Sequence, residues 1–235
     1  MAAIGWVFVH GWGLDAGFWQ PLRAALSAQP GACGAGVQHA LDAGYFGAAG
    51  PRIDWAAASR WIAVGHSLGW ARAWLEGATE APPGGWAASV SVCGFTRFCA
   101  TAPGQSGQAT RVVDRMVRAF DHDASAVLRD FLARCGLPDL ASAASTTPDT
   151  AGLRADLARL RDLDLPPAAW SAVPLLALAA RDDAIVSPAL THECFGAAPR
   201  ARLAWHDSAG HALGRIHAHW CAEHLQRFVQ ELPHG

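Results

Sequence analysis

Short, continuous apolar runs alternate along this chain with segments of helical periodicity. The runs lie at residues 4–9, 60–64, 87–92, 173–180 and 201–205, and a weaker strand is predicted at 37–41. Segments such as 16–28 and 216–232 instead space their apolar residues three or four positions apart, as an amphipathic helix does. A strand that is apolar at successive positions is buried on both faces, which is typical of a parallel sheet covered by helices. The sequence therefore predicts an α/β fold with a mostly parallel central sheet and helices on both faces.

The middle third of the chain has a different pattern. Between residues 95 and 165 no strand is predicted, and helical stretches are expected near 110–120, 125–135 and 152–160. We interpret this segment as a helical cap inserted into the α/β core. The predicted organisation is a core made of residues 1–94 and 166–235, with the cap formed by residues 95–165.

Composition excludes several classes of protein. With 51% hydrophobic residues the chain is not intrinsically disordered, and a net charge of −2 gives no basic excess for binding nucleic acid. No run approaches the ~20 apolar residues of a membrane-spanning helix. The six cysteines form no CxxC pair, and the first residues read as a strand rather than a signal peptide. We therefore expect free thiols and a cytoplasmic protein.

The most informative motif is Gly65-His66-Ser67-Leu68-Gly69, which fits the pattern G-x-S-x-G. An apolar strand precedes it and a helical segment follows it, as in the sharp turn that exposes a nucleophilic serine. Bulky side chains two positions before or after the serine would clash in such a turn, and both positions are glycine. The sequence thus predicts Ser67 as a nucleophile.

A serine nucleophile needs a base and a carboxylate that orients the base. In this kind of fold the chain order is serine, acid, histidine, each placed after a strand. Asp182 and Asp183 follow the run at 173–180, and we favour Asp183 because a small residue and two apolar ones follow it. For the base we favour His211, in a loop of small residues, over His206 at the strand end. Asp182 is interpreted as solvated or as stabilising its loop.

The turn His10-Gly11-Trp12-Gly13 follows the first strand, where this fold places part of its oxyanion hole. The expected donors are the backbone N–H groups of Trp12 and Leu68. An ordinary loop between a strand and a helix is the alternative interpretation of the turn.

A metal site was weighed as an alternative. His217, His219, Cys221 and His224 lie close together in the sequence, but no second ligand cluster with zinc-binding spacing accompanies them. No dinucleotide-binding or P-loop glycine pattern is present either. We therefore expect no metal and no cofactor.

Taken together, four motifs resemble the α/β-hydrolase superfamily. They are the segment 10–19, the pentapeptide 65–69, Asp183-Ala-Ile-Val186 and Ala209-Gly-His211-Ala212. The resemblance covers nearly the whole chain, and the closest family is the pimeloyl-acyl-carrier-protein methyl ester carboxylesterase family of biotin synthesis. It implies a serine esterase that cleaves the methyl ester of a carrier-bound pimeloyl chain without a cofactor.

The resemblance also implies an acyl pocket lined by the cap, in which the segment from Asp130 to Cys135 resembles the family's lining helix. The residues expected to bind substrate are Trp12, Trp70, Phe98, Phe131, Leu132, Ala133, Arg134 and Cys135. The cap arginines expected to meet the acidic carrier protein are Arg111, Arg115, Arg118, Arg129 and Arg134. These arginines do not match the family position by position, and they could instead form a solvated helical face.

Two departures from the family leave other functions open. The loop at 42–47 lacks the family's usual motif, and Trp70 stands where a small residue is common, so that it could narrow the acyl pocket. Both favour a general small-ester carboxylesterase as the second hypothesis. A non-catalytic binding protein is the third, although binding alone needs neither the serine nor its partners.

Overall fold

The computed structural model describes residues 3–47, 50, 52–75, 81–140 and 148–233. These residues contain a six-stranded sheet with the order β2–β1–β3–β4–β5–β6, in which every neighbouring pair is parallel. The strands are β1 (Ile4–Val9), β2 (Val37–Leu41), β3 (Arg60–His66), β4 (Ala88–Val92), β5 (Leu175–Ala180) and β6 (Ala201–His206). The predicted parallel sheet is thus confirmed.

Burial follows position in the sheet. The four central strands are buried along almost their whole length, whereas the edge strands β2 and β6 are partly exposed. Strands covered on both faces must be apolar at successive positions, and this is why they appear as continuous runs in the sequence. Within the sheet, Val9 of β1 pairs with Gly65 of β3, so that the turn after β1 lies beside the turn after β3.

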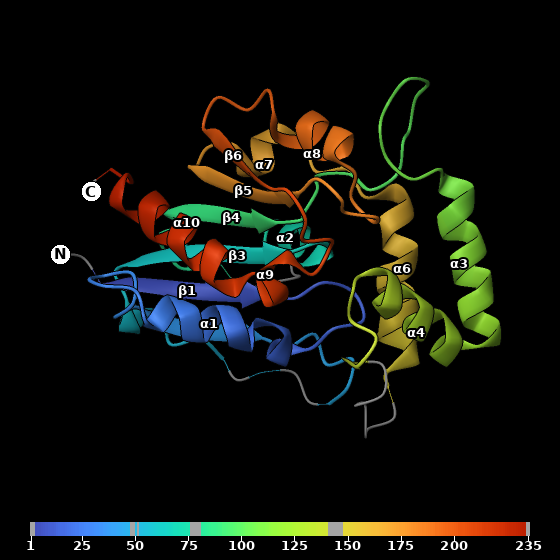
Figure 1. Cartoon of the computed structure of the whole chain (residues 1–235), viewed down its shortest axis with the longest axis horizontal. Helices are drawn as coiled ribbons and strands as arrows, with labels where there is room; N and C mark the ends of the chain where they lie inside the picture. Colours follow the sequence, from blue (N-terminus) through green and yellow to red (C-terminus); the bar gives the residue numbers. More distant parts are fainter. Residues whose placement is uncertain (1–2, 48–49, 51, 76–80, 141–147, 234–235) are drawn as a thin grey trace.

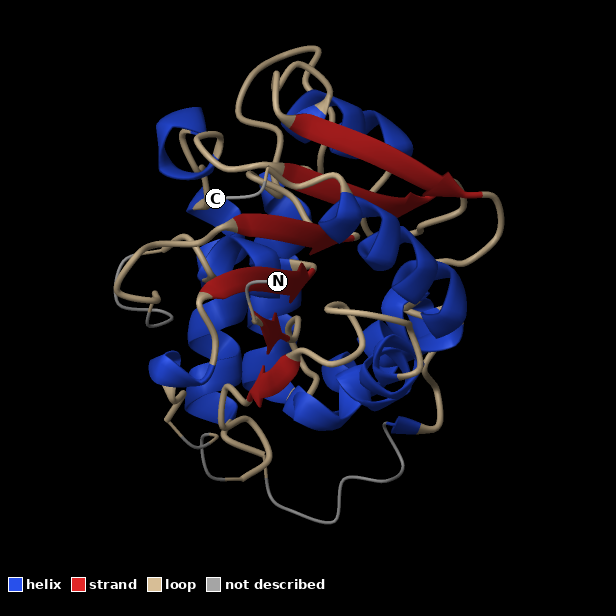
Figure 2. Ribbon diagram, turned by 90° about the vertical axis from the view of Figure 1, so that its left-hand side faces the viewer, coloured by secondary structure: helices blue, strands red, loops and turns tan. Residues whose placement is uncertain are grey.

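Helices cover both sides of the strands, as Figure 2 shows, and α1 and α10 lie together in front of the sheet in Figure 1. The described helices outside residues 95–165 are α1 (Gln20–Ser27), α2 (Leu68–Arg72), α7 (Pro167–Trp170), α8 (Pro188–Phe195), α9 (Leu213–Ile216) and α10 (Ala218–Gln230). Short 3₁₀ turns occupy Ala16–Trp19 and Trp55–Ala57. The helix predicted over 216–232 is divided, because His217 leaves the helical conformation between α9 and α10. None of the described helices is long and apolar enough to span a bilayer.

A second group of helices lies beyond the carboxyl ends of the strands (Figure 1). It consists of α3 (Thr110–His122), α4 (Ala124–Arg134) and α6 (Thr150–Asp162). Between residues 95 and 165 the described part of the chain has isolated bridges but no strand, and one bridge joins Arg97 to Asp164. That bridge brings the two ends of the helical segment together. The division of the chain into a core and a cap at residues 95 and 165 stays a prediction.

A buried polar network connects α6 to the core. The hydroxyl of Tyr45 donates to Asp156 Oδ2 at 2.6 Å, and Arg72 Nη1 lies 3.3 Å from the same carboxylate oxygen. Arg72 also donates to the Tyr45 hydroxyl at 3.2 Å. Tyr45 belongs to the loop that departs from the family pattern. The loop and α2 are therefore both joined to α6, because Tyr45 and Arg72 contact the same carboxylate of Asp156.

Replacing Asp156 by alanine should lower the free energy of unfolding by about 3 kcal/mol, because it leaves the mostly buried Arg72 charge without its partner. Chemical denaturation followed by circular dichroism measures the change. Asp121→Ala is the matched control, since its ion pair with Arg154 is exposed and should contribute little. Equal losses in the two variants would contradict a structural role for the network.

Candidate active site

Ser67 lies in a sharp turn between β3 and α2. Its φ of 54° and ψ of −128° are unusual for a residue with a side chain. Such strain persists only where the surrounding structure enforces it, and it is concentrated at functional sites. The residue is 6% exposed, at the carboxyl end of the central strands. The geometry is that of a nucleophile elbow.

Close packing explains the two glycines of the motif. A Cβ atom on Gly65 would lie 2.2 Å from the Cα of Trp70, and one on Gly69 would lie 2.2 Å from the carbonyl oxygen of Val9. Both obstacles are backbone atoms, which cannot yield as a flexible side chain would. The expectation that bulk would clash on either side of Ser67 is confirmed.

His211 and Asp183 form a buried pair. His211 Nδ1 lies 2.8 Å from Asp183 Oδ2, and both side chains are almost fully excluded from solvent. The other carboxylate oxygen of Asp183 accepts from the backbone N–H groups of Ile185 and Val186. Burial alone would raise the pKa of Asp183, but His211 and the two N–H groups lower it below its ordinary value. The carboxylate is therefore held ionised and fixed in orientation.

The geometry also separates the rival candidates. Asp182 Oδ1 accepts from the N–H groups of Ala209 and Gly210 at 2.9 and 2.8 Å, so that this aspartate holds the loop that carries His211. His206 packs its ring against His217 instead, with centroids 4.1 Å apart. Of the two aspartates and two histidines considered, the structure pairs Asp183 with His211.

The second ring nitrogen of His211, Nε2, does not contact Asp183 and can form another hydrogen bond. Nε2 is buried and has no hydrogen-bond partner among the described residues. His66, directly before Ser67, donates from Nε2 to the His211 backbone carbonyl at 2.9 Å, and the two rings lie 4.8 Å apart. His211 is thus anchored against the serine turn through the backbone as well as through Asp183.

His66 is a neutral structural histidine. Its ring stacks on Phe18 with centroids 4.4 Å apart and is fully buried. Burial, and after it the proximity of His211, lower its pKa to about 3. The donor to the His211 carbonyl is therefore present without a charge beside the site.

The turn after β1 lies against Ser67, as predicted for an oxyanion hole. A Cβ on Gly11 would lie 3.1 Å from the Cβ of Ser67. His10 holds the turn, since Nδ1 donates to the Gly11 carbonyl and Nε2 accepts from the backbone N–H of Ala43. Leu68 is the first residue of α2, and the first N–H groups of a helix have no carbonyl one turn earlier to bind.

The indole of Trp12 connects the turn to the helical segment above it. Its Nε1 donates to the Leu153 carbonyl at 2.7 Å, and its ring packs edge-on against Phe120 and Phe131. Leu128 also reaches this turn, because its Cδ1 would lie 2.6 Å from a Cβ on Gly13. Sequence reasoning missed Leu128, although its position one turn before Phe131 on one helix was a usable signal.

Two residues predicted to contact substrate have surroundings that differ from those of Trp12 and Phe131. Trp70 is fully buried, and its ring packs on Trp170 and Phe195 at 5.6 and 4.9 Å. Ala133 is exposed, because a helix turns about 100° per residue and consecutive side chains cannot all face one cavity.

The other predicted contacts are placed as follows. Leu132 and Cys135 are buried. Burial raises the pKa of the Cys135 thiol, and the nearby charge of Asp183 raises it as a smaller cause. Phe98 packs on Phe95 with centroids 5.0 Å apart. Arg134 is exposed at the end of α4. Their roles toward substrate stay predictions.

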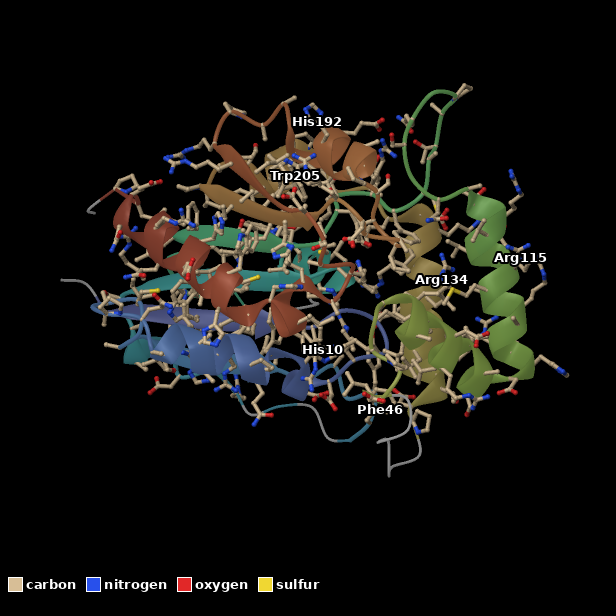
Figure 3. The ribbon with its side chains drawn as sticks, viewed as in Figure 1. His10, Phe46, Arg115, Arg134, His192 and Trp205 are labelled. Carbon is tan, nitrogen blue, oxygen red and sulfur yellow. The ribbon has the colours of Figure 1, made fainter. Side chains whose placement is uncertain are left out.

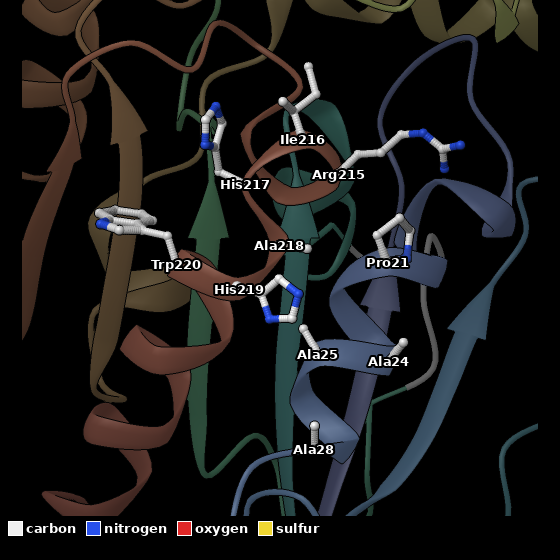
Figure 4. Close-up of a pocket in the computed structure, with 10 residues that line it drawn as sticks. All are labelled: Pro21, Ala24, Ala25, Ala28, Arg215, Ile216, His217, Ala218, His219 and Trp220. Atoms are coloured by element: carbon white, nitrogen blue, oxygen red, sulfur yellow. The ribbon is translucent and has the colours of Figure 1, made fainter.

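A surface groove of about 620 Å³ lies elsewhere, between α1 and the segment 215–220 (Figure 4). None of Ser67, Asp183 and His211 lines it. His217 and His219 line it, whereas Cys221 is buried and bonds to the Leu213 carbonyl. His224 packs on Trp220. The structure therefore does not gather the four residues considered as zinc ligands around one point.

Solved structures share this arrangement of strands and helices. An esterase from Exiguobacterium antarcticum matches with a TM-score of 0.74 and 16% identity, over 98% of this chain and 94% of that one. The fold is that of the α/β-hydrolases. A bromoperoxidase from Bacillus anthracis matches with a TM-score of 0.72 and 19% identity, over 98% and 93% of the two chains. An enol-lactonase from Burkholderia xenovorans matches with a TM-score of 0.70 and 16% identity, over 98% and 92%.

No protein-family model matches the sequence, and no curated protein matches it either. The identities with these three solved structures are 16–19%, so these likenesses establish the α/β-hydrolase fold alone. Function has to be argued from the site.

Proposed function

We propose that this α/β-hydrolase-fold protein is a serine carboxylesterase with Ser67 as nucleophile, His211 as base and Asp183 as the orienting acid. The observation that carries the proposal is the buried His211–Asp183 hydrogen bond, with His211 Nε2 unpartnered beside the strained serine turn. A protein that only binds a ligand has no need of this arrangement. The esterases among the solved structures of this fold support the same reaction class.

The reaction proceeds in two stages. His211 Nε2 takes the proton of Ser67 as the serine oxygen attacks the ester carbonyl, and Asp183 stabilises the imidazolium that forms. His211 then returns the proton to the departing alcohol, which leaves an acyl group on Ser67. In the second stage His211 takes a proton from water, the hydroxide attacks the acyl group, and Ser67 regains its proton as the acid departs. The chemistry needs no cofactor.

Negative charge develops on the ester carbonyl oxygen as Ser67 attacks, and the backbone N–H groups of Trp12 and Leu68 are proposed to donate hydrogen bonds to that oxygen. Each such donor stabilises a transition state by on the order of 3–4 kcal/mol. The acyl chain would lie toward the helical segment, where Trp12, Phe120, Leu128 and Phe131 offer an apolar surface. Apolar lining with few polar groups suits the hydrocarbon part of an ester.

A fluorophosphonate probe tests the nucleophile. The wild-type protein should take up one probe per chain at Ser67, because the reagent reacts with a serine activated by its histidine. Ser67→Ala should be unlabelled and should not hydrolyse p-nitrophenyl esters. Ser208→Ala, which removes an exposed hydroxyl from the loop before His211, is the matched control and should still be labelled. An unlabelled but folded wild-type protein would favour the non-catalytic alternative.

For the substrate we propose the methyl ester of a pimeloyl chain on acyl carrier protein, as the family resemblance implies. The predicted cap arginines support it, since they are exposed on α3 and α4, where Arg115 projects outward in Figure 3. Within the described residues, no carboxylate forms an ion pair with Arg115, Arg118, Arg129 or Arg134. An acidic carrier could pair its carboxylates with these four guanidinium groups.

Reversing the charge of two cap arginines tests whether the acyl group is carried by acyl carrier protein. Arg118→Glu with Arg129→Glu should raise KM for the carrier-bound ester at least tenfold and leave the free methyl ester unaffected, because only the carrier meets these side chains. Arg227→Glu, at an exposed position of α10 outside the predicted cap, is the control. If both esters are hydrolysed equally well by all variants, the second hypothesis of a general carboxylesterase takes precedence.

A further inference from the structure

The end of β4 contributes a thiol to the active site. Cys93 follows Val92 directly and has a φ of 50°; among the described residues other than glycine, only Ser67 shares a positive φ. The side chain is 1% exposed, and its sulfur lies 3.9 Å from the carbonyl oxygen of Gly210, in the loop that carries His211. The reaction proposed above makes no use of this thiol.

Three possible metal ligands meet at this point. The sulfur of Cys93, a carboxylate oxygen of Asp183 and a ring nitrogen of His211 all lie within 4.8 Å of one another. The bond lengths of a tetrahedral zinc site place its S, N and O ligand atoms about 3.3–3.8 Å apart. His211 Nδ1 and Asp183 Oδ2 lie 2.8 Å apart and would have to separate by about 0.5 Å, and the Cys93 sulfur would have to approach them by about 1 Å, to reach the geometry of a zinc site.

We propose that Cys93, Asp183 and His211 form an inhibitory site for a thiophilic divalent ion such as Zn²⁺. One thiolate, one imidazole and one carboxylate are a ligand set that zinc prefers, and the fourth position is left for water. The inhibitory effect rests on the proposed function of His211 and Asp183, whereas the binding of the ion does not.

The inhibition follows from proton positions. The ion replaces the thiol proton of Cys93, which is released to water, because only the thiolate is a good ligand. It also occupies His211 Nδ1, so the ring proton moves to Nε2. A histidine protonated at Nε2 cannot accept the proton of Ser67, and Asp183 no longer orients the ring. The burial of all three groups predicts a slow onset of inhibition.

Two measurements test the proposal. Zn²⁺ should inhibit ester hydrolysis slowly and be reversed by a chelator. Cd²⁺ should produce the ultraviolet thiolate-to-metal absorption with one ion per chain. In Cys93→Ala the Cd²⁺ absorption should disappear. The zinc concentration that halves the rate of this variant, measured against its own rate without zinc, should be at least tenfold higher than for the wild type. Cys93→Ser, which is closest in size, provides the same comparison if the alanine variant folds poorly.

Controls separate this site from others. Cys221→Ser removes a neighbouring buried thiol, and His217→Gln disrupts the surface pair of His217 and His206; both should behave as the wild type. Loss of the absorption in either control, its retention in Cys93→Ala, or equal zinc inhibition of wild type and Cys93→Ala would overturn the proposal. If the protein proves to have no esterase activity, the Cd²⁺ absorption still decides whether the site exists.

Discussion

Asp183→Asn should lower kcat by about 10⁴-fold, whereas Asp182→Asn should lower it less than tenfold. In the native protein one oxygen of Asp183 accepts two backbone N–H groups and the other accepts from His211 Nδ1. An asparagine would keep its oxygen on the two N–H groups and turn its amide NH₂ toward His211. The imidazole would then have to accept at Nδ1 and carry its proton at Nε2, where it cannot take the proton of Ser67.

The comparison with Asp182 makes this test specific. Asp182 accepts from Ala209 and Gly210 through one oxygen, which asparagine retains, so its replacement preserves the loop that carries His211. Steady-state kinetics on a p-nitrophenyl ester measures both variants, and circular dichroism checks that both are folded. Equal losses of kcat, or the reverse order, would refute the assignment of Asp183.

The positions of Ser67, Asp183 and His211 could be predicted because each follows an apolar run. Parallel strands end at one edge of the sheet, so residues that directly follow several strands meet in space although they are far apart in sequence. The order of the three along the chain then restricted their possible roles. The hydrogen bond between His211 and Asp183 shows that two of the three side chains do meet, as this reasoning predicts.

The side on which a residue faces was much harder to predict. Trp70 and Phe131 are both large and apolar in helices near the site, yet Trp70 packs on Phe195 of α8 and Phe131 packs on Trp12 of the turn after β1. Hydrophobic periodicity shows that a helix buries one face, but not which neighbour that face meets. Ala133 illustrates the same limit. It is close to Phe131 in the sequence, but a helix turns about 100° per residue, so the two side chains face different directions.

Contacts between distant polar groups gave no signal in the sequence. A single cysteine after an apolar run does not reveal that Cys93 lies beside Asp183 and His211. The network of Tyr45, Arg72 and Asp156 is likewise built from residues of three separate elements. Such contacts depend on the register and tilt of whole elements, which no local pattern encodes.

The protein should lose stability as the pH falls from about 6.5 toward 3, and His66 should be a main cause. Burial holds the pKa of folded His66 at about 3, while an exposed histidine in the unfolded chain titrates near 6.5. Between these values the unfolded state binds a proton that the folded state does not. Stability therefore rises with pH through this window, by about 1.4 kcal/mol for each unit where the difference is one full proton. Above about 6.5 this contribution is fully present.

His66→Gln isolates this contribution. Glutamine can donate to the His211 carbonyl as His66 does, but it does not titrate, so the free energy of unfolding should depend much less on pH between 6 and 4. Urea unfolding at several pH values measures the slope. His122→Gln, at the exposed end of α3, controls for the loss of a histidine as such. An unchanged slope in His66→Gln would show that folded His66 takes up a proton as readily as the unfolded chain does, which would contradict the lowered pKa of this buried ring.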